Sequence, residues 1–230
     1  MIKLFEQLLN ALLPEDCVVC ERPLVEGERF LCLACSAAIP GLEVNDFTDN
    51  AVHETLASTH PVDKAAALFR YRRGSPYTRL IHYAKYNGRP HMARFLGQRL
   101  GMRLSDTGFF NGIEALVPVP LNGWRMIKRG YNQSAEIAKG ISVYSGIPVV
   151  GMLKARRHST QTFKGAAGRR ANAKGIFLVK DVKTVSAYNH IALVDDVITT
   201  GSTMLECAEA IRQAAPGIKI SVLAAALTEL

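Results

Sequence analysis

Apolar segments of strand length alternate along the chain with segments whose apolar residues recur at helical spacing. The helical spacing predicts helices at 76–86, 90–103, 133–143 and 202–214. The short apolar runs predict strands at 64–71, 114–119, 148–153, 176–179, 190–194 and 218–226. Because strands and helices alternate, the expected fold class is α/β, a mostly parallel sheet with helices on both faces.

The junction between residues 191 and 203 is the most informative part of this pattern. The apolar run Ile191–Val194 leads into Asp195 and Asp196, and Thr199-Thr200-Gly201-Ser202-Thr203 then opens a predicted helix. Free amides at the helix start, the positive end of its dipole and several hydroxyls can converge there on one phosphate. Gly201 lets the backbone approach closely. The two carboxylates can accept hydrogen bonds from vicinal hydroxyls. A phosphate and a diol within reach of one loop indicate a ribose 5-phosphate.

A plainer interpretation stays open for the same residues. An acid pair can simply cap a helix, and Thr-Thr-Gly can simply make a turn. A P-loop nucleotidase is excluded, since no Gly-x-x-x-x-Gly-Lys-Ser/Thr sequence occurs. In a parallel sheet, ligands bind beyond the carboxyl ends of the strands. We therefore expect the 195–203 junction to lie beside the segment 121–133, which follows the strand ending at Val119.

Four of the five cysteines form two Cys-x-x-Cys pairs, Cys17 with Cys20 and Cys32 with Cys35. Two such pairs can supply four thiolates in a tetrahedron, which predicts a structural Zn²⁺ site. A disulfide framework and a redox Cys-x-x-Cys remain as alternatives, but the first lacks an export signal and the second needs no second pair. Cys207 lies on the apolar face of the 202–214 helix and is expected to be an inert core thiol.

The net charge of +8 is concentrated in one part of the chain. Eleven lysines and arginines between Arg125 and Lys174 face one acid, a net +10, which leaves −2 for the rest. Such a cluster suits pyrophosphate in a cleft or a nucleic-acid backbone across a face, or it is a solvated surface without a partner. No apolar run reaches the roughly 18–20 residues of a membrane span, and the first 13 residues read as a short amphipathic helix. We expect no membrane insertion and a cytoplasmic protein.

The segment Leu193–Thr203 resembles the PRPP-binding signature of type I phosphoribosyltransferases. A wider resemblance is to the ComF/GntX family, bacterial phosphoribosyltransferase-like proteins linked to natural competence. It is carried by Lys85-Tyr86, 117–121, 129–133, Gln161, the series Arg169, Asn172 and Phe177, and the cysteine pairs. The chain is expected to divide into a helix and zinc unit at 1–40, a weakly patterned connector at 41–62 with one short helix, and a phosphoribosyltransferase-like domain at 63–230.

The resemblance also implies residue roles. PRPP would bind to Asp195, Asp196, Val197, Thr199, Thr200, Gly201, Ser202 and Thr203. Pyrophosphate and a mobile catalytic loop would involve Arg129, Asn132, Gln133, Arg157, Gln161, Arg169 and Asn172, with Arg156 beside the two aspartates in catalysis. Asn132 could instead only start a helix. Mg²⁺ is expected to accompany PRPP. No base-reading motif identifies the acceptor, and Lys85 is expected on an exposed helix face.

Two functions follow from these residues. The first is transfer of ribose 5-phosphate from PRPP to an unknown acceptor with release of pyrophosphate. The second is sequence-independent binding of single-stranded DNA by the same fold without catalysis. The zinc unit is a candidate contact for other competence or DNA-processing proteins.

Overall fold

The computed structural model describes residues 16–42, 46–56, 62–85, 90–156 and 175–229. At its centre, four strands form one sheet in the order β1-β6-β5-β2, and all neighbouring pairs are parallel. Their bounds are Ala65–Tyr71 for β1, Ala115–Pro118 for β2, His190–Ile198 for β5 and Lys219–Thr228 for β6. The predicted parallel α/β fold is therefore confirmed.

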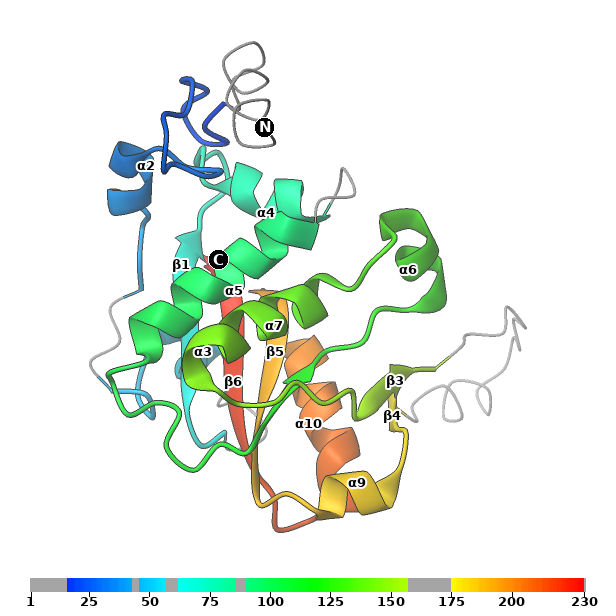
Figure 1. The fold of residues 1–230 in the computed structure, drawn as a ribbon. Helices are drawn as coiled ribbons and strands as arrows, with labels where there is room; N and C mark the ends of the chain where they lie inside the picture. Colours follow the sequence, from blue (N-terminus) through cyan, green and yellow to red (C-terminus); the bar gives the residue numbers. More distant parts are fainter. Residues whose placement is uncertain (1–15, 43–45, 57–61, 86–89, 157–174, 230) are drawn as a thin grey trace, which may run out of the picture.

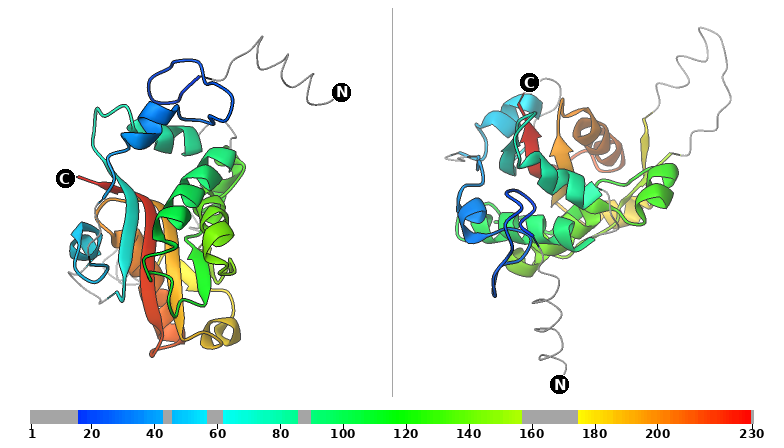
Figure 2. Two further views of the ribbon diagram at one scale, coloured as in Figure 1. Left: turned by 60° about the vertical axis from the view of Figure 1, so that its left-hand side comes forward. Right: turned by 90° about the horizontal axis from the view of Figure 1, so that it is seen from above.

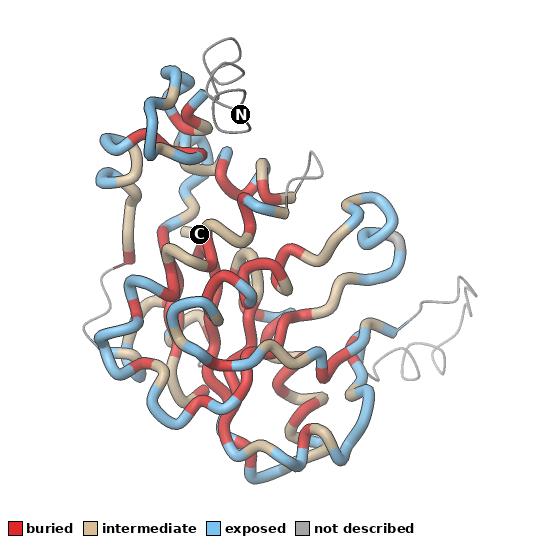
Figure 3. The backbone as a smooth tube through the Cα atoms, in the orientation of Figure 1, coloured by how far each residue is buried: buried red, intermediate tan, exposed pale blue. Residues whose placement is uncertain are grey.

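Helices cover both faces of this sheet (Figures 1 and 2). One face carries α4 (Thr78–Lys85), α5 (Pro90–Leu104) and α7 (Gln133–Ser145), whose apolar side chains form one buried cluster with the sheet. The other face carries α3 (Ala51–Leu56), α9 (Val182–Ser186) and α10 (Ser202–Ala214) over a second cluster. The strands are buried on both faces, as Figure 3 shows, which explains their continuous apolar runs.

The region between α7 and β5 differs from the expected pattern. The strand predicted at 148–153 is wrong, since only Val149 bridges to Leu116 and the strand β3 begins later, at Leu153–Ala155. β3 pairs antiparallel with β4 (Phe177–Val179), so both lie outside the main sheet. The segment 157–174, between β3 and β4 in the sequence, is outside the described residues.

Three short helices escaped the sequence pattern: α9, and two without a buried residue in the described part of the chain. α6 (Gly123–Arg129) follows β2 and projects from the body as an arm (Figure 1), with exposed residues along most of its length. α2 (Leu33–Ala37) lies within the four-cysteine unit. Both have too few buried residues to give an apolar stripe of helical period.

The four-cysteine unit shares a core with the rest of the chain. Cys17, Val19, Phe30 and Cys32 belong to the same buried cluster as Leu80 of α4. The rings of Phe30 and Phe95 are 5.4 Å apart, centroid to centroid. The helix expected in the first 13 residues is outside the described part of the chain. Among the described helices, none is long and apolar enough to cross a membrane.

Candidate functional site

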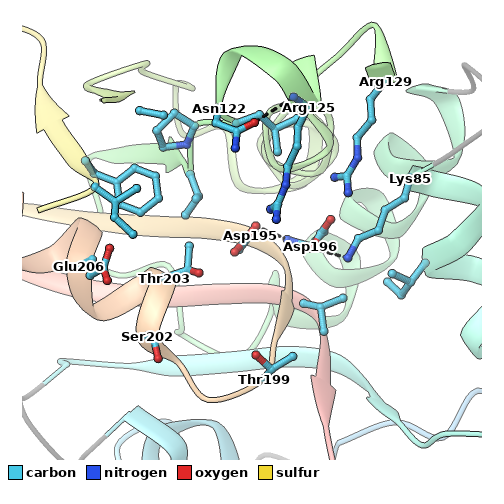
Figure 4. A pocket seen from close by; sticks show the side chains of 18 of the residues that line it. Lys85, Asn122, Arg125, Arg129, Asp195, Asp196, Thr199, Ser202, Thr203 and Glu206 are labelled. Atoms are coloured by element: carbon cyan, nitrogen blue, oxygen red, sulfur yellow. Dashed lines mark hydrogen bonds and ion pairs between the residues drawn. The ribbon is translucent and has the colours of Figure 1, made fainter. Parts of the chain in front are cut away.

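A cavity of about 710 Å³ opens at the carboxyl ends of β5 and β2. It brings together the two aspartates of β5, the start of α10, the loop after β2, α6, the end of α4 and the base of the β3–β4 hairpin (Figure 4). β2 and β5 are hydrogen-bonded neighbours, and the Val119 amide donates to the Val194 carbonyl at 2.9 Å. The predicted meeting of the 195–203 junction with the segment after Val119 is therefore confirmed.

Asp195 and Asp196 extend β5 into the cavity wall. β5 runs on to Ile198 rather than ending at Val194, so the acids sit inside the strand. Asp195 Oδ1 accepts hydrogen bonds from Ser134 Oγ and from the Asp196 amide, both at 2.8 Å. Asp196 Oδ1 lies 3.2 Å from Lys85 Nζ. Both acids line the cavity, so neither is turned wholly into the interior.

Burial and the neighbouring charge raise the pKa of Asp195. Loss of hydration is the larger cause, and the negative charge of Asp196 is the next. The hydrogen bonds from Ser134 and the Asp196 amide, together with Lys85, act in the opposite direction, and the pKa comes to about 7. A carboxyl group whose pKa is raised to near neutral pH is typical of functional sites.

The turn before α10 has the geometry of an anion site. Gly201 is the N-cap of α10 in the left-handed region (φ +76°), and no side chain of the described residues caps this helix. The first-turn amides are therefore free of a side-chain acceptor. The hydroxyls of Thr199, Ser202 and Thr203 line the cavity, and Thr200 Oγ1 lies 2.7 Å from Ser202 Oγ. Thr200 and Gly201 shape the turn without lining the cavity.

Gly201 is required for a further reason that the sequence did not reveal. A Cβ atom there would lie 2.6 Å from Leu56 Cδ2 and 3.3 Å from the Thr55 carbonyl oxygen. α3, in the predicted connector, thus packs directly beneath the turn. The absence of a side chain at Gly201 therefore leaves room for α3 as well as for a ligand.

Cationic side chains surround the opposite wall. Asn122 caps α6 by accepting a hydrogen bond from the Arg125 amide at 2.9 Å, and the Arg125 side chain lies toward the two aspartates (Figure 4). Arg129, in the last turn of α6, also lines the cavity and donates to Gln133 Oε1 at 3.0 Å. Exposed Arg156, at the end of β3, completes this wall.

Asn132 and Gln133 are placed behind the cavity rather than in its lining. Asn132 caps α7 by accepting from the Ser134 amide, and its side-chain amide donates to the Val119 carbonyl at 2.9 Å. Gln133 is fully buried and holds Arg129. These contacts give both residues a structural role, and their direct contact with pyrophosphate stays a prediction. Arg157, Gln161, Arg169 and Asn172 lie outside the described residues.

Sequence reasoning missed several residues in or beside the cavity, among them Lys85, Ser134 and Glu206. Lys85 was expected on an exposed face, but its side chain is only 24% exposed and is paired with Asp196, so that expectation is wrong. Ser134 supports Asp195 from 61 positions away. Glu206, one turn into α10, lines the cavity, and its Oε2 is buried with no hydrogen-bond partner among the described residues. Its three-residue spacing from Thr203 was the signal available for Glu206; no local pattern marks the other two.

The second candidate site is the group of four cysteines. The Sγ atoms of Cys17, Cys20, Cys32 and Cys35 all lie within 4.8 Å of one another. The Sγ atoms of Cys20 and Cys32 are 3.8 Å apart, and a tetrahedron with metal–sulfur bonds of about 2.3 Å has edges of about 3.8 Å. The Cys35 amide donates to Cys32 Sγ and is the main cause that lowers the pKa of that thiol. The four thiols could therefore hold a structural metal ion.

Comparison with known proteins gives the chain a family. It is 30% identical over 210 residues to competence protein F of Haemophilus influenzae, a match that covers 86% of this chain and 90% of that protein. The chain belongs to the ComF family. This ComF-family chain is also 27% identical over 216 residues to the DNA utilization protein YhgH of Escherichia coli K12, covering 85% of the chain and 90% of YhgH. No protein-family model matches.

Solved structures are similar at a much greater distance. The allosteric regulatory enzyme of purine biosynthesis matches with a TM-score of 0.41 and 20% identity over 58% of this chain and 25% of its own. Glutamine PRPP amidotransferase from B. subtilis, complexed with ADP and GMP, matches with a TM-score of 0.41 and 19% identity over 57% of this chain. The chain spans about a quarter of the length of each, 25% and 26%. Neither likeness carries an argument about function.

Proposed function

We propose that this ComF-family chain binds PRPP in the cavity at β5 and transfers its phosphoribosyl group to an acceptor with release of pyrophosphate. The observation that supports this most strongly is that one cavity contains both Asp195-Asp196 and the uncapped N-terminus of α10. A phosphate on the turn and a ribose diol on the carboxylates would occupy neighbouring parts of one wall. The acceptor remains outside the proposal.

In the bound state, the turn would hold the 5-phosphate. Amides of the first turn of α10 and the hydroxyls of Thr199, Ser202 and Thr203 are the donors, and the helix dipole favours the negative charge. Binding energy at this remote group would position the ribose C1 atom for reaction. Asp195 and Asp196 would accept hydrogen bonds from the ribose hydroxyls.

In the transfer step, the acceptor forms a bond to C1 while the bond from C1 to the pyrophosphate oxygen breaks. Pyrophosphate leaves with the electron pair, and the ribose gains oxocarbenium character. The carboxylates would stabilise the positive charge on the ribose, and Arg125, Arg129 and Arg156 would stabilise the negative charge on pyrophosphate. Mg²⁺ prefers phosphate oxygens and water, so it would arrive bound to the substrate and neutralise part of that charge.

We infer further that the metal of the four-cysteine site is Zn²⁺. Four thiolates in a closed tetrahedron suit zinc and leave no position for a substrate. The role would then be structural, because a unit of fewer than about 40 residues rarely folds on its core alone.

Sequence-independent binding of single-stranded DNA is the second candidate function. It is favoured by the α6 arm, where Arg125 and Lys128 are exposed beside Ile127, which is 85% exposed. Competence protein F and YhgH, by their names, also concern competence and DNA utilization. Binding of a fluorescent 20-nucleotide oligothymidine should weaken at least tenfold between 50 and 200 mM salt if several phosphates are neutralised. Absence of binding at low salt rules this function out.

The phosphoribosyltransferase proposal is tested by titrating PRPP and Mg²⁺ into the protein in a calorimeter. Replacing Asp195→Ala together with Asp196→Ala removes two charge-assisted acceptors, and binding should weaken at least about 100-fold. Asp106→Ala, at an exposed acid away from the cavity, is the matched control and should bind as the wild type does. Unchanged binding by a folded double variant overturns the proposal.

A further inference from the structure

Helix α4 links the two candidate sites of the molecule. The start of α4 lies beside the four-cysteine unit (Figure 1), and its last residue, Lys85, lines the cavity (Figure 4). The helix has eight residues, so it spans about 12 Å. Isolated helices of this length are marginal in water. α4 therefore depends on its contacts at both ends and along its buried face.

At its N-terminal end, α4 is held by backbone carbonyls of the four-cysteine unit. Tyr77 Oη, one residue before the helix, donates to the carbonyl of the metal-ligand residue Cys35 at 3.0 Å. Arg79 Nη1 donates at 3.3 Å to the carbonyl of Val19, which lies between Cys17 and Cys20 in the sequence. Arg79 also pairs with Glu21 at 2.6 Å, but both side chains are about half exposed or more. The positions of these carbonyls depend on how the two pairs are folded.

At its C-terminal end, α4 is held by residues in and beside the cavity. Lys85 Nζ meets Asp196 Oδ1 at 3.2 Å, with side chains only 24% and 13% exposed. The Ala84 carbonyl accepts a hydrogen bond from Tyr131 Oη, which follows the α6 arm. Between the two ends, Leu80, Ile81 and Ala84 are buried in the cluster that also contains Cys17 and Cys32. One packed core thus runs from the thiols to the base of Lys85.

We propose that the four-cysteine unit, when it holds its metal, fixes α4 and thereby places Lys85 against Asp196, so that metal binding and ligand binding are thermodynamically coupled. Without the metal, the unit loses much of the free energy that folds it. The Tyr77 and Arg79 contacts then lose fixed acceptors, and the short helix frays. Lys85 is a positioning residue for Asp196 in this scheme. The ligand half of the coupling rests on the proposed function; the metal half does not.

The first measurement needs no ligand. Deuterium exchange of the full chain is compared before and after an excess of a zinc chelator, with bound metal quantified in each sample. Exchange of the 78–85 amides should rise at least fivefold on metal removal, while exchange in α10 stays unchanged as an internal reference. Equal exchange in α4 with and without metal overturns the proposal.

The second measurement uses ribose 5-phosphate as the probe. Metal removal should raise its Kd about fivefold or more in the wild type, within the usual range of coupling between sites. In Lys85→Met, which lacks the pair with Asp196, the same treatment should change the Kd less than twofold. An equal rise in both proteins overturns the coupling through Lys85. If the wild type binds no ribose 5-phosphate, the proposed function fails, and the exchange data alone decide the link between the unit and α4.

A metal-retaining variant covers the case in which chelation unfolds the whole chain. Tyr77→Phe with Arg79→Leu removes the hydrogen bonds to the unit and keeps most of the packing. It should retain one metal per chain, exchange faster in α4 and bind ribose 5-phosphate more weakly. Tyr144→Phe, at a half-exposed tyrosine of α7, is the matched control and should behave as the wild type. Wild-type exchange in the double variant overturns the proposal.

Discussion

Two parts of the cavity, here called the floor and the rim, are built in different ways. The floor, residues 195–203, belongs to β5 and the start of α10, and β5 has parallel neighbours on both sides. The rim, formed by Lys85, Arg125, Arg129 and Arg156, is carried on α4, α6 and the end of β3. The floor continues a strand that is buried on both faces, whereas the α6 arm is exposed along most of its length (Figure 3).

This difference separates geometry set by packing from geometry set by polar contacts. The turn at Gly201 is enclosed by Leu56 and the strand core, so its shape is fixed before any ligand arrives. The α6 part of the rim is positioned by polar contacts such as the hydrogen bond from Arg129 to Gln133. A preorganised floor suits a group that must be held still, and an adjustable rim suits a leaving group whose charge develops during reaction.

Among changes that test this difference between floor and rim, Gly201→Ala is expected to have the largest effect, a loss of stability. Alanine would have to adopt φ +76° and place its Cβ 2.6 Å from Leu56 Cδ2. Left-handed strain and overpacking together should lower the free energy of unfolding by about 3 kcal/mol, measured by urea denaturation. Gly74→Ala is the control, since it has φ +84° with nothing within 4 Å, and should cost only about 1 kcal/mol. Equal losses in the two variants would mean that α3 does not fix the floor.

The sequence predicted the floor well because its signals are local. An apolar run, two acids and a glycine-centred turn within thirteen residues specify a strand and a helix start without knowledge of the rest of the fold, although the strand continues through the acids to Ile198. The four cysteines were equally local, as two short pairs. The parallel sheet and the place of the loop after Val119 followed from the alternation of elements.

The rim could not be predicted in this way, because its contacts join distant segments. Lys85 and Asp196 are 111 positions apart, and Ser134 and Asp195 are 61 apart. A lysine at a helix end has no local feature that distinguishes an exposed side chain from one paired with a partly buried acid. The burial of Gln133 likewise depends on how α7 packs against the sheet, not on its own neighbours in sequence.

A smaller effect on stability is expected from a change of pH, which acts through Asp195 in the floor. The raised pKa of Asp195 means that the folded state binds a proton at pH values where the unfolded chain has released it. Stability from this group is therefore present below about pH 4 and is lost as the pH rises to about 7. Urea denaturation of the ligand-free protein at pH 5.0 and 7.5 should show this fall, and Asp195→Asn should reduce it. Since the other titrating groups are common to both proteins, identical pH dependence would show that Asp195 titrates normally.

The smallest expected effect is on PRPP binding, and it comes from replacing one of two neighbouring cations of the α6 arm. Comparing the two replacements is also the sharpest test of the rim. Arg125 lines the cavity and Lys128 does not, although both are exposed on the same short helix. Arg125→Ala should weaken PRPP binding about five- to tenfold, the effect of one charge-assisted contact, whereas Lys128→Ala should leave it unchanged. Binding of oligothymidine should respond differently, because a phosphate backbone lying across the arm would meet both cations, and each substitution should then weaken it similarly. Calorimetry with PRPP and anisotropy with the oligonucleotide therefore separate a cavity that selects one small anion from a surface that attracts any polyanion. If Lys128→Ala weakens PRPP binding as much as Arg125→Ala does, the arm acts only through its general charge, and the rim has no defined position for pyrophosphate.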